Sequence, residues 1–344
     1  MNMNRLFTMD DVYIIAEIAQ NHDGSLGMAH AFIDAVASAG ASAIKFQTHI
    51  ASEESTIHEP FRVNFSYCDK TRYDYWQRME FTEEEWQGLY DHACEKGIDF
   101  LSSPFSLKAL RMLDRIGVSA WKLGSGEVFN DVLLDAAIAT GKPIIISTGL
   151  SSLEDTDCLV ERIQRAGNKL VLMECTTAYP SKAENIPINM ISKFIERYHC
   201  CVGISDHSAT VFPALSAVTL GARCVEVHVT MSHAMFGPDV PASVTIDQLK
   251  EIVEGVAFIR KMQESSVDKK ELSDETKTLR TMFSKCLYLN KEIKKGAVLS
   301  ETEIGIKKPF NEKGIPAKNY RDVIGRTMAV DAGMDDLLKW EMLQ

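Results

Sequence analysis

The segment "VEVHVT", residues 225–230, alternates valine with charged or polar residues. A period of two predicts a β-strand whose valines share one face. The opposite face then carries Glu226, His228 and Thr230. Charged and titratable side chains are rarely buried unless something binds them. The segment therefore predicts a buried strand with a binding site on one of its faces.

Seven upstream segments have the same β-like texture and alternate with helix-like segments. The predicted strands are 12–19, 42–48, 98–105, 120–126, 143–149, 169–176, 201–207 and 224–230. Three intervening helical patterns end at a glycine suited to a C-terminal cap, namely Gly40, Gly117 and Gly167. The last predicted helix spans about 245–262.

Eight strand–helix units in about 250 residues match an α/β fold, the (β/α)8 or TIM barrel. A doubly wound open sheet is the alternative. It is disfavoured by the count of eight and because no GxGxxG turn follows the first strand.

Two stretches fall outside this regular pattern. The connection at residues 49–80 is too long for a barrel turn and is expected to form part of the mouth of the site. The polar segment "ESSVDKKELSDETK" is typical of a linker, and a short turn-rich β-like region follows it. We therefore expect a barrel domain at 1–265, a linker at 266–284 and a second, small domain at 285–344.

Composition narrows the class of protein. The 344 residues carry a net charge of −11, which argues against a nucleic-acid surface and means that an anionic substrate needs local positive charge. No window approaches ~18 uninterrupted apolar residues, and no signal-peptide core is visible at the start. The eight cysteines are scattered without a CxxC pair. Reduced thiols in a cytoplasmic protein are expected.

Polar residues gather at the predicted carboxyl ends of seven of the eight strands, where barrels of this kind place their active sites. They are Glu17, Lys45, Gln47, Lys122, Ser125, Glu127, Ser147, Thr148, Thr176, Thr177, Tyr179, Ser205, Asp206, His207, Glu226 and His228. A single serine or threonine there would be an ordinary turn residue. Together they predict an active site.

His207 and His228 end neighbouring predicted strands, and two imidazoles there can bind a divalent metal if oxygens complete its coordination. Mn²⁺ or Mg²⁺ is expected rather than a structural zinc. The alternative is a pair of structural histidines held by hydrogen bonds. His22, His49 and His233 are predicted near the same rim but without a paired partner.

Lys45 and Lys122 are predicted to point into the mouth of the barrel. Each could be a Schiff-base nucleophile, an anion anchor or half of an ion pair with a carboxylate such as Glu17. The neighbouring serines and the "GSG" turn favour an anion anchor, with phosphate as the expected anion. The residues therefore indicate a metal-assisted barrel enzyme that acts on a phosphorylated anion.

Several motifs, in order along the chain, resemble the sialic acid synthase family, the phosphoenolpyruvate-condensing synthases of nonulosonic acids. They are "IIAEIAQNHDGSLGMA", "AIKFQTH", "FLSSPFS", "WKLGSGE", "GKPIIISTG", "ECTTAYPS", "GISDHS" and "FGPDVPAS". The C-terminal "EIKKGAVLSETEI" and "GIPAKNYRDVIGR" resemble the antifreeze-like (SAF) domain of that family. The resemblance covers essentially the whole chain.

The resemblance implies a homodimer in which the cap of one subunit closes over the barrel of its partner. It also implies a C–C bond-forming transferase that condenses phosphoenolpyruvate with the open-chain aldehyde of an N-acyl hexose and releases phosphate. The first expectation is N-acetylmannosamine, giving N-acetylneuraminate. Legionaminate and pseudaminate synthases, which use diacetamido-trideoxy hexoses, are near alternatives. A pyruvate-dependent metal aldolase and a non-catalytic binding protein are alternatives of other classes.

The resemblance also implies roles for residues that match the family motifs. It implies a metal at His207 and His228; phosphoenolpyruvate contacts at Lys45, Lys122, Ser125, Ser147, Thr177 and Ser205; sugar contacts at Gln47, Tyr179, Asp239 and Lys308; and catalysis by Glu17, Glu127 and His228. Two positions depart from the pattern. Thr177 stands where some members have asparagine, and Lys308 where many bacterial members have an arginine that reaches the N-acetyl group. Lysine lacks the planar fork of arginine, which leaves the exact acyl sugar open.

Overall fold

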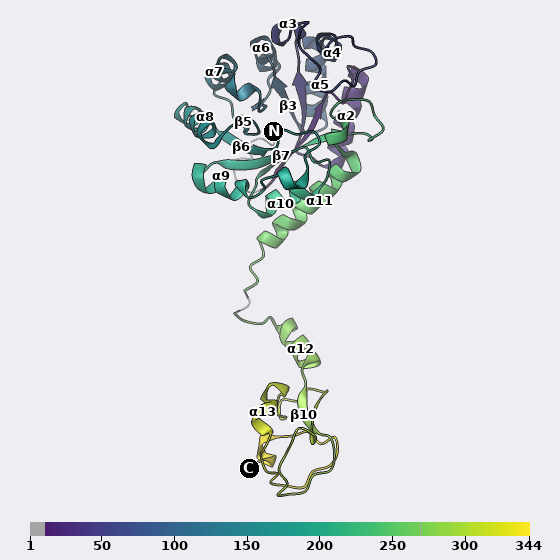
Figure 1. The fold of residues 1–344 in the computed structure, drawn as a ribbon, viewed down its shortest axis with the longest axis vertical. Helices are drawn as coiled ribbons and strands as arrows, with labels where there is room; N and C mark the ends of the chain where they lie inside the picture. Colours follow the sequence, from purple (N-terminus) through teal and green to yellow (C-terminus); the bar gives the residue numbers. More distant parts are fainter. Residues whose placement is uncertain (1–10, 269) are drawn as a thin grey trace. The chain divides into compact units, whose positions relative to one another are not determined.

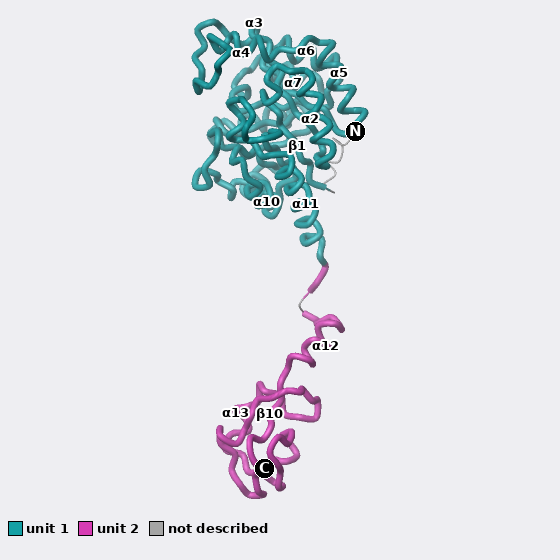
Figure 2. Tube along the Cα trace, turned by 90° about the vertical axis from the view of Figure 1, so that its right-hand side faces the viewer, with its two compact units in different colours: residues 1–265 teal, residues 266–344 magenta. Residues whose placement is uncertain are grey.

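The computed structural model describes residues 11–268 and 270–344. The chain divides into two compact units, Met1–Ser265 and Ser266–Gln344 (Figure 2). Among the described residues, no helix has both the length and the apolar composition needed to cross a membrane.

Unit 1 alternates strands with helices along the chain (Figure 1). Its strands are β1 (Tyr13–Ala19), β2 (Ala43–Thr48), β3 (Asp99–Pro104), β4 (Trp121–Leu123), β5 (Ile144–Ser147), β6 (Leu170–Cys175), β7 (Cys201–Asp206), β8 (Cys224–Thr230) and the short β9 (Val244–Thr245). Its helices are α2 (Leu26–Ala39), α3 (Ala51–Glu54), α4 (Arg72–Met79), α5 (Glu83–Glu95), α6 (Leu107–Ile116), α7 (Asp131–Ala139), α8 (Leu153–Arg165), α9 (Met190–Tyr198), α10 (Phe212–Thr219) and α11 (Ile246–Gln263).

The predicted barrel is confirmed. The strands β1 to β8 pair in parallel in the order β3-β2-β1-β8-β7-β6-β5-β4. The pairing of β1 with β8 brings the first and last strands together, and β3 also contacts β4, so the sheet curls into a nearly closed barrel. The open doubly wound sheet is therefore wrong. Strand β4 is shorter than the predicted 120–126, because the chain turns after Leu123 into a 3₁₀ helix at Glu127–Phe129.

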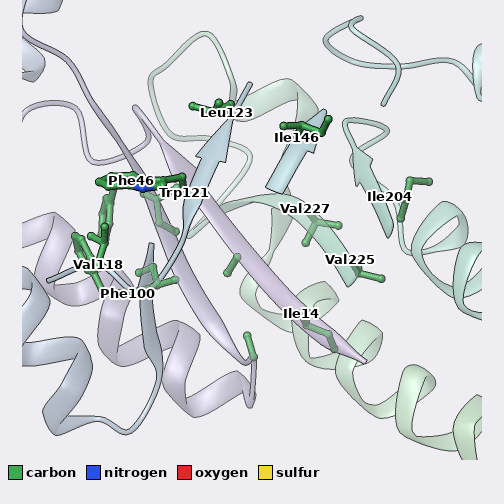
Figure 3. Close-up of a cluster of buried hydrophobic side chains, with 14 of the residues drawn as sticks. Ile14, Phe46, Phe100, Val118, Trp121, Leu123, Ile146, Ile204, Val225 and Val227 are labelled. Atoms are coloured by element: carbon green, nitrogen blue, oxygen red, sulfur yellow. The ribbon is translucent and has the colours of Figure 1, made fainter. Parts of the chain in front are cut away.

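Both faces of the barrel strands are buried, for different reasons. Val225 and Val227 of β8 belong to the core between the strands and the surrounding helices (Figure 3). The alternate residues of β8, Glu226 and His228, face the barrel interior. Near the amino ends of the strands this interior is filled by apolar side chains: Tyr13, Ile15, Ala43, Leu101, Ala120, Ile145, Val171, Met173 and Cys224. Towards the carboxyl ends the same inward positions become polar, which leaves room for a site.

Local signals explain where several helices begin and end. Ser25 caps α2 by accepting a hydrogen bond from the backbone N–H of Met28. The predicted C-terminal glycines Gly40 and Gly117 have φ values of 83° and 99°, a left-handed conformation that glycine adopts without steric cost. Gly167, just after α8, has a φ of 83°. These helices end where the sequence predicts.

Unit 2 contains α12 (Asp274–Phe283), β10 (Cys286–Leu289), β11 (Ile304–Lys307) and α13 (Tyr320–Val323). Strands β10 and β11 pair in antiparallel fashion over a small core that includes Leu287, Ile315 and Leu338. The segment predicted as a linker, 266–284, contains a short helix. Its second half begins α12, where Ser273 caps the helix by accepting from the N–H of Thr276. The polar composition of this segment predicted that it is exposed to solvent, but it did not predict the helix.

Glu174 of β6 is a buried acid outside the active site. It follows Leu170 and Leu172 on the strand face that packs against helices, and only 5% of it is exposed. Burial raises the pKa of Glu174 to about 7, although the backbone N–H of Cys175 opposes this. The folded protein therefore retains a proton there that the unfolded chain releases above its ordinary pKa of about 4.3.

This raised pKa makes stability fall as pH rises from about 4.5 to about 7, after which the loss is complete. The variant E174Q removes the ionisation, and we expect it to exceed wild type by about 2–3 kcal/mol in free energy of unfolding at pH 8, with little difference at pH 4.5. Urea unfolding of both proteins at several pH values measures this. The exposed control E251Q should show no such trend, and a pH-independent effect of E174Q would contradict the assignment.

Candidate active site

A cavity of about 580 Å³ opens at the carboxyl ends of the barrel strands. Of the site residues expected from the sequence, the following line it: Glu17, Lys45, Gln47, Lys122, Ser125, Glu127, Ser147, Thr177, Tyr179, Ser205, His207, Glu226, His228 and Asp239. Thr148, Thr176, Asp206 and Lys308 are not part of its lining. Lys308 belongs to unit 2, where its Nζ lies 4.9 Å from the centroid of the Phe283 ring. The fold thus brings together side chains that are separated by more than 200 positions in sequence.

Two lysines and two glutamates form a charged layer in the cavity. Lys45 Nζ lies 2.5 Å from Glu17 Oε2 and 3.9 Å from Glu226 Oε1. Lys122 Nζ lies 3.4 Å from the same oxygen of Glu226 and donates to Ser147 Oγ at 2.7 Å. Each of these four side chains is at most 4% exposed. The ion pair considered for Lys45 is therefore present.

Glu226 is the charged residue of the "VEVHVT" strand, and these lysines explain its burial. Ser205 Oγ donates to Glu226 Oε1 at 3.0 Å. Burial would raise the pKa of Glu226, but Lys122 and Lys45 outweigh it and hold the pKa below its ordinary value. Burial raises the pKa of Glu17, although Lys45 opposes this. One carboxylate is thus firmly ionised while the other is easier to protonate.

A tight turn at Gly149, just after β5, packs against Ser125 and Thr177 in the cavity wall. The backbone N–H of Gly149 donates to Ser125 Oγ at 3.1 Å. A Cβ atom at position 149 would lie 2.2 Å from Thr177 Oγ1 and 3.0 Å from Ser125 Oγ. Only glycine therefore lets this turn approach the two hydroxyls so closely.

The two histidines expected to bind metal lie side by side. Their ring centroids are 5.0 Å apart, and the Tyr179 ring lies 4.2 Å from that of His207. His207 Nδ1 donates to the carbonyl oxygen of Thr176 at 3.0 Å, which leaves its Nε2 with a free lone pair. His228 Nδ1 is buried without a hydrogen-bond partner.

Burial keeps both imidazoles neutral. It lowers the pKa of His207 to about 4 and that of His228 well below its ordinary value. Within the described ranges, no group of three or more His, Cys, Asp and Glu side chains converges as a complete metal site. The protein therefore offers two neutral nitrogen donors rather than a closed coordination shell.

Gln47, Glu127 and Asp239 also line the cavity. Gln47 Nε2 donates to Glu17 Oε1 at 2.8 Å, so the amide holds the catalytic candidate in place. Glu127 is half-buried and accepts from Asn130 Nδ2 at 3.2 Å; burial raises its pKa. Burial also raises the pKa of Asp239, although nearby Arg62 opposes this.

Sequence reasoning missed the role of His49, which was predicted to lack a partner. Its ring lies between Trp76 and Phe105, at centroid distances of 4.0 and 4.4 Å. His49 Nδ1 lies 2.7 Å from Glu54 Oε1, and its Nε2 lies 3.2 Å from Gln47 Oε1. Gln20 Nε2 lies 2.8 Å from His49 Nε2 and donates to Gln47 Oε1 at 2.7 Å. A hydrogen-bonded chain therefore runs from Glu54 through His49, Gln20 and Gln47 to Glu17. The histidine directly follows "KFQT" in the sequence, but its partners do not show there.

The insertion at 49–80 lines the outer part of the cavity, as its length predicted. Its contributions are Glu53, Glu54, Glu59, Phe61, Arg62, Val63, Phe65, Arg72, Tyr75 and Trp76, together with His49 at its start. Arg62 contacts two predicted sugar-facing residues, Asp239 and Tyr179. No motif in the sequence identified this arginine.

Comparisons with known proteins show which chains this one resembles. The chain is 30% identical over 337 residues to N,N'-diacetyllegionaminic acid synthase of Campylobacter jejuni, covering 96% of this chain and 100% of that one. It is 31% identical over 346 residues to pseudaminic acid synthase of the same species, covering 98% of each. The crystal structure of N-acetylneuraminic acid (sialic acid) synthetase from Leptospira borgpetersenii matches with a TM-score of 0.70 and 28% identity, covering 79% of this chain and 91% of that one.

Two parts of the chain also match separate family descriptions. Residues 32–268 match the NeuB family, and residues 284–344 match the SAF domain. The first match spans most of the barrel, including Lys45, Lys122, Glu226 and the histidine pair, while Glu17 lies before it. The resemblance seen in the motifs is confirmed: the chain belongs to the NeuB family of sialic acid synthase-like proteins and ends in a SAF domain.

Proposed function

We propose that this protein condenses phosphoenolpyruvate with the aldehyde form of an N-acyl hexose, with N-acetylmannosamine and N-acetylneuraminate as first candidates for acceptor and product. The observation that carries the proposal is the buried lysine pair beside the histidine pair in one cavity of a NeuB-family barrel. The lysines suit a small anion, and the wider outer part suits a sugar.

Phosphoenolpyruvate is proposed to bind at the lysine end. Lys45 and Lys122 supply ammonium groups for its phosphate and carboxylate, and both are already held in place by buried carboxylates. The hydroxyls of Ser125, Ser147 and Thr177 line the same region, with Ser205 beside Glu226. Because these donors are fixed before binding, they lower the entropic cost of orienting the enol carbon.

His207 and His228 fit a divalent cation, Mn²⁺ or Mg²⁺. The free Nε2 of His207 and the unpartnered buried Nδ1 of His228 leave each ring a nitrogen for a ligand. Neutral imidazoles are the form that coordinates metals. When bound, such an ion supplies Lewis-acid polarisation of the aldehyde oxygen.

In the reaction, C3 of the enol forms a bond to the aldehyde carbon, and C2 gains positive character. We assign stabilisation of that charge to the carboxylate of Glu127. Water then adds to C2, and the tetrahedral intermediate releases phosphate. Glu17, whose pKa is raised by burial, is assigned to hold the sugar hydroxyls or to move a proton, with Gln47 fixing its orientation.

Synthesis of legionaminate or pseudaminate is the second candidate function. The C. jejuni relatives at 30% and 31% identity favour it, because they cover almost the whole chain. Their acceptors would carry acetamido and methyl groups where N-acetylmannosamine has hydroxyls. A site that binds hydroxyls through polar groups discriminates strongly against analogues that lack them.

An acceptor panel tests the proposed function. Full-length protein with phosphoenolpyruvate and Mn²⁺ or Mg²⁺ is assayed for phosphate release with N-acetylmannosamine and with 2,4-diacetamido-2,4,6-trideoxy hexoses, and the product mass is measured. We expect one acceptor to give a nine-carbon 2-keto acid with phosphate in equal amount. Equal turnover with pyruvate in place of phosphoenolpyruvate, or no phosphate release with any acceptor, would contradict the proposal.

The SAF domain supports a further proposal about assembly. We propose a homodimer in which the C-terminal domains are exchanged between subunits, as the family resemblance implies. Light scattering of the full-length protein measures its mass in solution, and a monomer at assay concentration would exclude this arrangement.

A further inference from the structure

Arg62 occupies the part of the cavity where the proposed acceptor would bind. It lies in the insertion between α3 and α4, outside the strand ends that supply most of the site. Its Nη2 lies 3.3 Å from Asp239 Oδ1, and its Cζ lies 4.4 Å from the centroid of the Tyr179 ring. The Tyr179 ring in turn lies 4.2 Å from the His207 ring. The guanidinium is thus one aromatic ring away from the histidine pair.

The insertion holds this arginine through aromatic packing. Phe65 lies three residues after Arg62. Its ring centroid is 5.0 Å from that of Tyr75 in an edge-to-face contact and 5.7 Å from that of Phe236 in a tilted contact. Tyr75 is only 3% exposed, so the cluster is built on a buried side chain of α4. Phe236 lies in the loop that leads to Asp239. The same packing therefore positions both partners of the Arg62–Asp239 pair.

The Arg62 guanidinium has more N–H donors than its hydrogen bond to Asp239 uses. Five N–H groups are available on arginine, and the hydrogen bond to Asp239 uses one of the two Nη atoms. The Arg62 side chain is 45% exposed, whereas that of Asp239 is 9% exposed. The free donors therefore reach the open part of the cavity, and the buried carboxylate and Tyr179 restrict the orientation of the group.

The surroundings indicate which oxygen these donors bind. A guanidinium can only donate, so its natural partner is an oxygen that only accepts, such as an amide carbonyl, a carboxylate or a phosphate. The outer cavity also contains the acids Glu53, Glu59 and Glu127, and Arg72 lies 3.3 Å from Glu59. This excess of carboxylates disfavours a second dianion at the mouth. Among the oxygens that only accept, an uncharged carbonyl is the partner that remains.

We propose that Arg62 is a specificity-determining residue that binds the carbonyl oxygen of the acylamido group on the acceptor hexose. The inference rests on the proposed condensation and specifies how the acceptor is selected. It also gives the 49–80 insertion a role in substrate recognition. Arg62 acts by contact with substrate, while Asp239 and Tyr179 orient it.

The test compares R62A and R62K with wild type on matched acceptors. One acceptor is the hexose that the panel identifies, and the other is the same hexose with hydroxyl in place of the acylamido group. We expect R62A to lower kcat/KM roughly 10- to 100-fold for the acylated hexose, mainly through its KM, and much less for the hydroxyl analogue. R62K keeps the positive charge without the planar guanidinium, and its kcat/KM for the acylated hexose should lie between those of wild type and R62A. The KM for phosphoenolpyruvate should stay within about twofold.

Controls separate recognition from damage to the fold. R111K changes an exposed arginine on α6 and should leave both acceptors unaffected. A purely structural role for Arg62, through its pair with Asp239, would lower activity equally on both acceptors and overturn the proposal. A selective loss for the 6-phosphorylated hexose would also overturn it, in favour of phosphate recognition. Absence of wild-type turnover with every hexose would instead refute the condensation itself.

Discussion

The double variant H207A/H228A is expected to fold, to lose Mn²⁺ binding and to lose at least roughly 10³-fold in kcat/KM. Both imidazoles are neutral and buried in the cavity, and a nitrogen of each lacks a protein hydrogen-bond partner or carries a free lone pair. Among the described residues, no group of three or more His, Cys, Asp and Glu side chains offers another ion site. Chelation of the wild type should abolish turnover, and added Mn²⁺ or Mg²⁺ should restore it.

The measurements are Mn²⁺ titration by calorimetry or electron paramagnetic resonance, together with initial rates over a range of added metal. H30N is a suitable control, because His30 lies on α2, outside the cavity. Circular dichroism confirms that each variant is folded. Wild-type rates in H207A/H228A, or unchanged Mn²⁺ affinity, would refute the metal proposal and leave the alternative of two structural histidines.

The second large effect concerns the buried charged layer. K122M removes the lysine 3.4 Å from Glu226 and leaves two buried carboxylates to share Lys45. Breaking a buried ion pair in this way typically costs about 3–5 kcal/mol of stability, because one charge loses its partner. The KM for phosphoenolpyruvate should also rise roughly 100-fold, since an anchoring ammonium is gone.

The double variant K122M/E226Q separates these two effects. It returns the layer to electrical balance, so most of the lost stability should come back, while the KM for phosphoenolpyruvate remains high. Urea unfolding and steady-state kinetics on wild type, both single variants and the double variant complete the cycle. If the double variant regained affinity for phosphoenolpyruvate as well as stability, Lys122 would be a structural counter-ion and the anchor role would be wrong.

Much of the site could be found in the sequence because barrel geometry is regular. The carboxyl ends of parallel strands meet at one rim, so strand-end residues such as Lys45, Lys122 and Ser147 had to come together once the strand count was known. Contacts between residues in loops could not be predicted from the sequence in this way. Arg62 and Asp239 meet across 177 positions through the packing of Phe65 and Phe236, and no periodicity encodes such a contact.

The order of polar and apolar residues in "VEVHVT" was enough to specify a strand with two unlike faces. It was also enough, with its seven counterparts, to specify a parallel barrel, because each side chain's face follows from backbone geometry alone. Which partner each inward residue finds is a matter of three-dimensional proximity. The structure assigns Glu226 to two lysines from other strands, and it leaves His228 beside His207 with an unpartnered nitrogen. Those pairings depend on ångström distances between segments far apart in the chain, and only the folded molecule sets such distances.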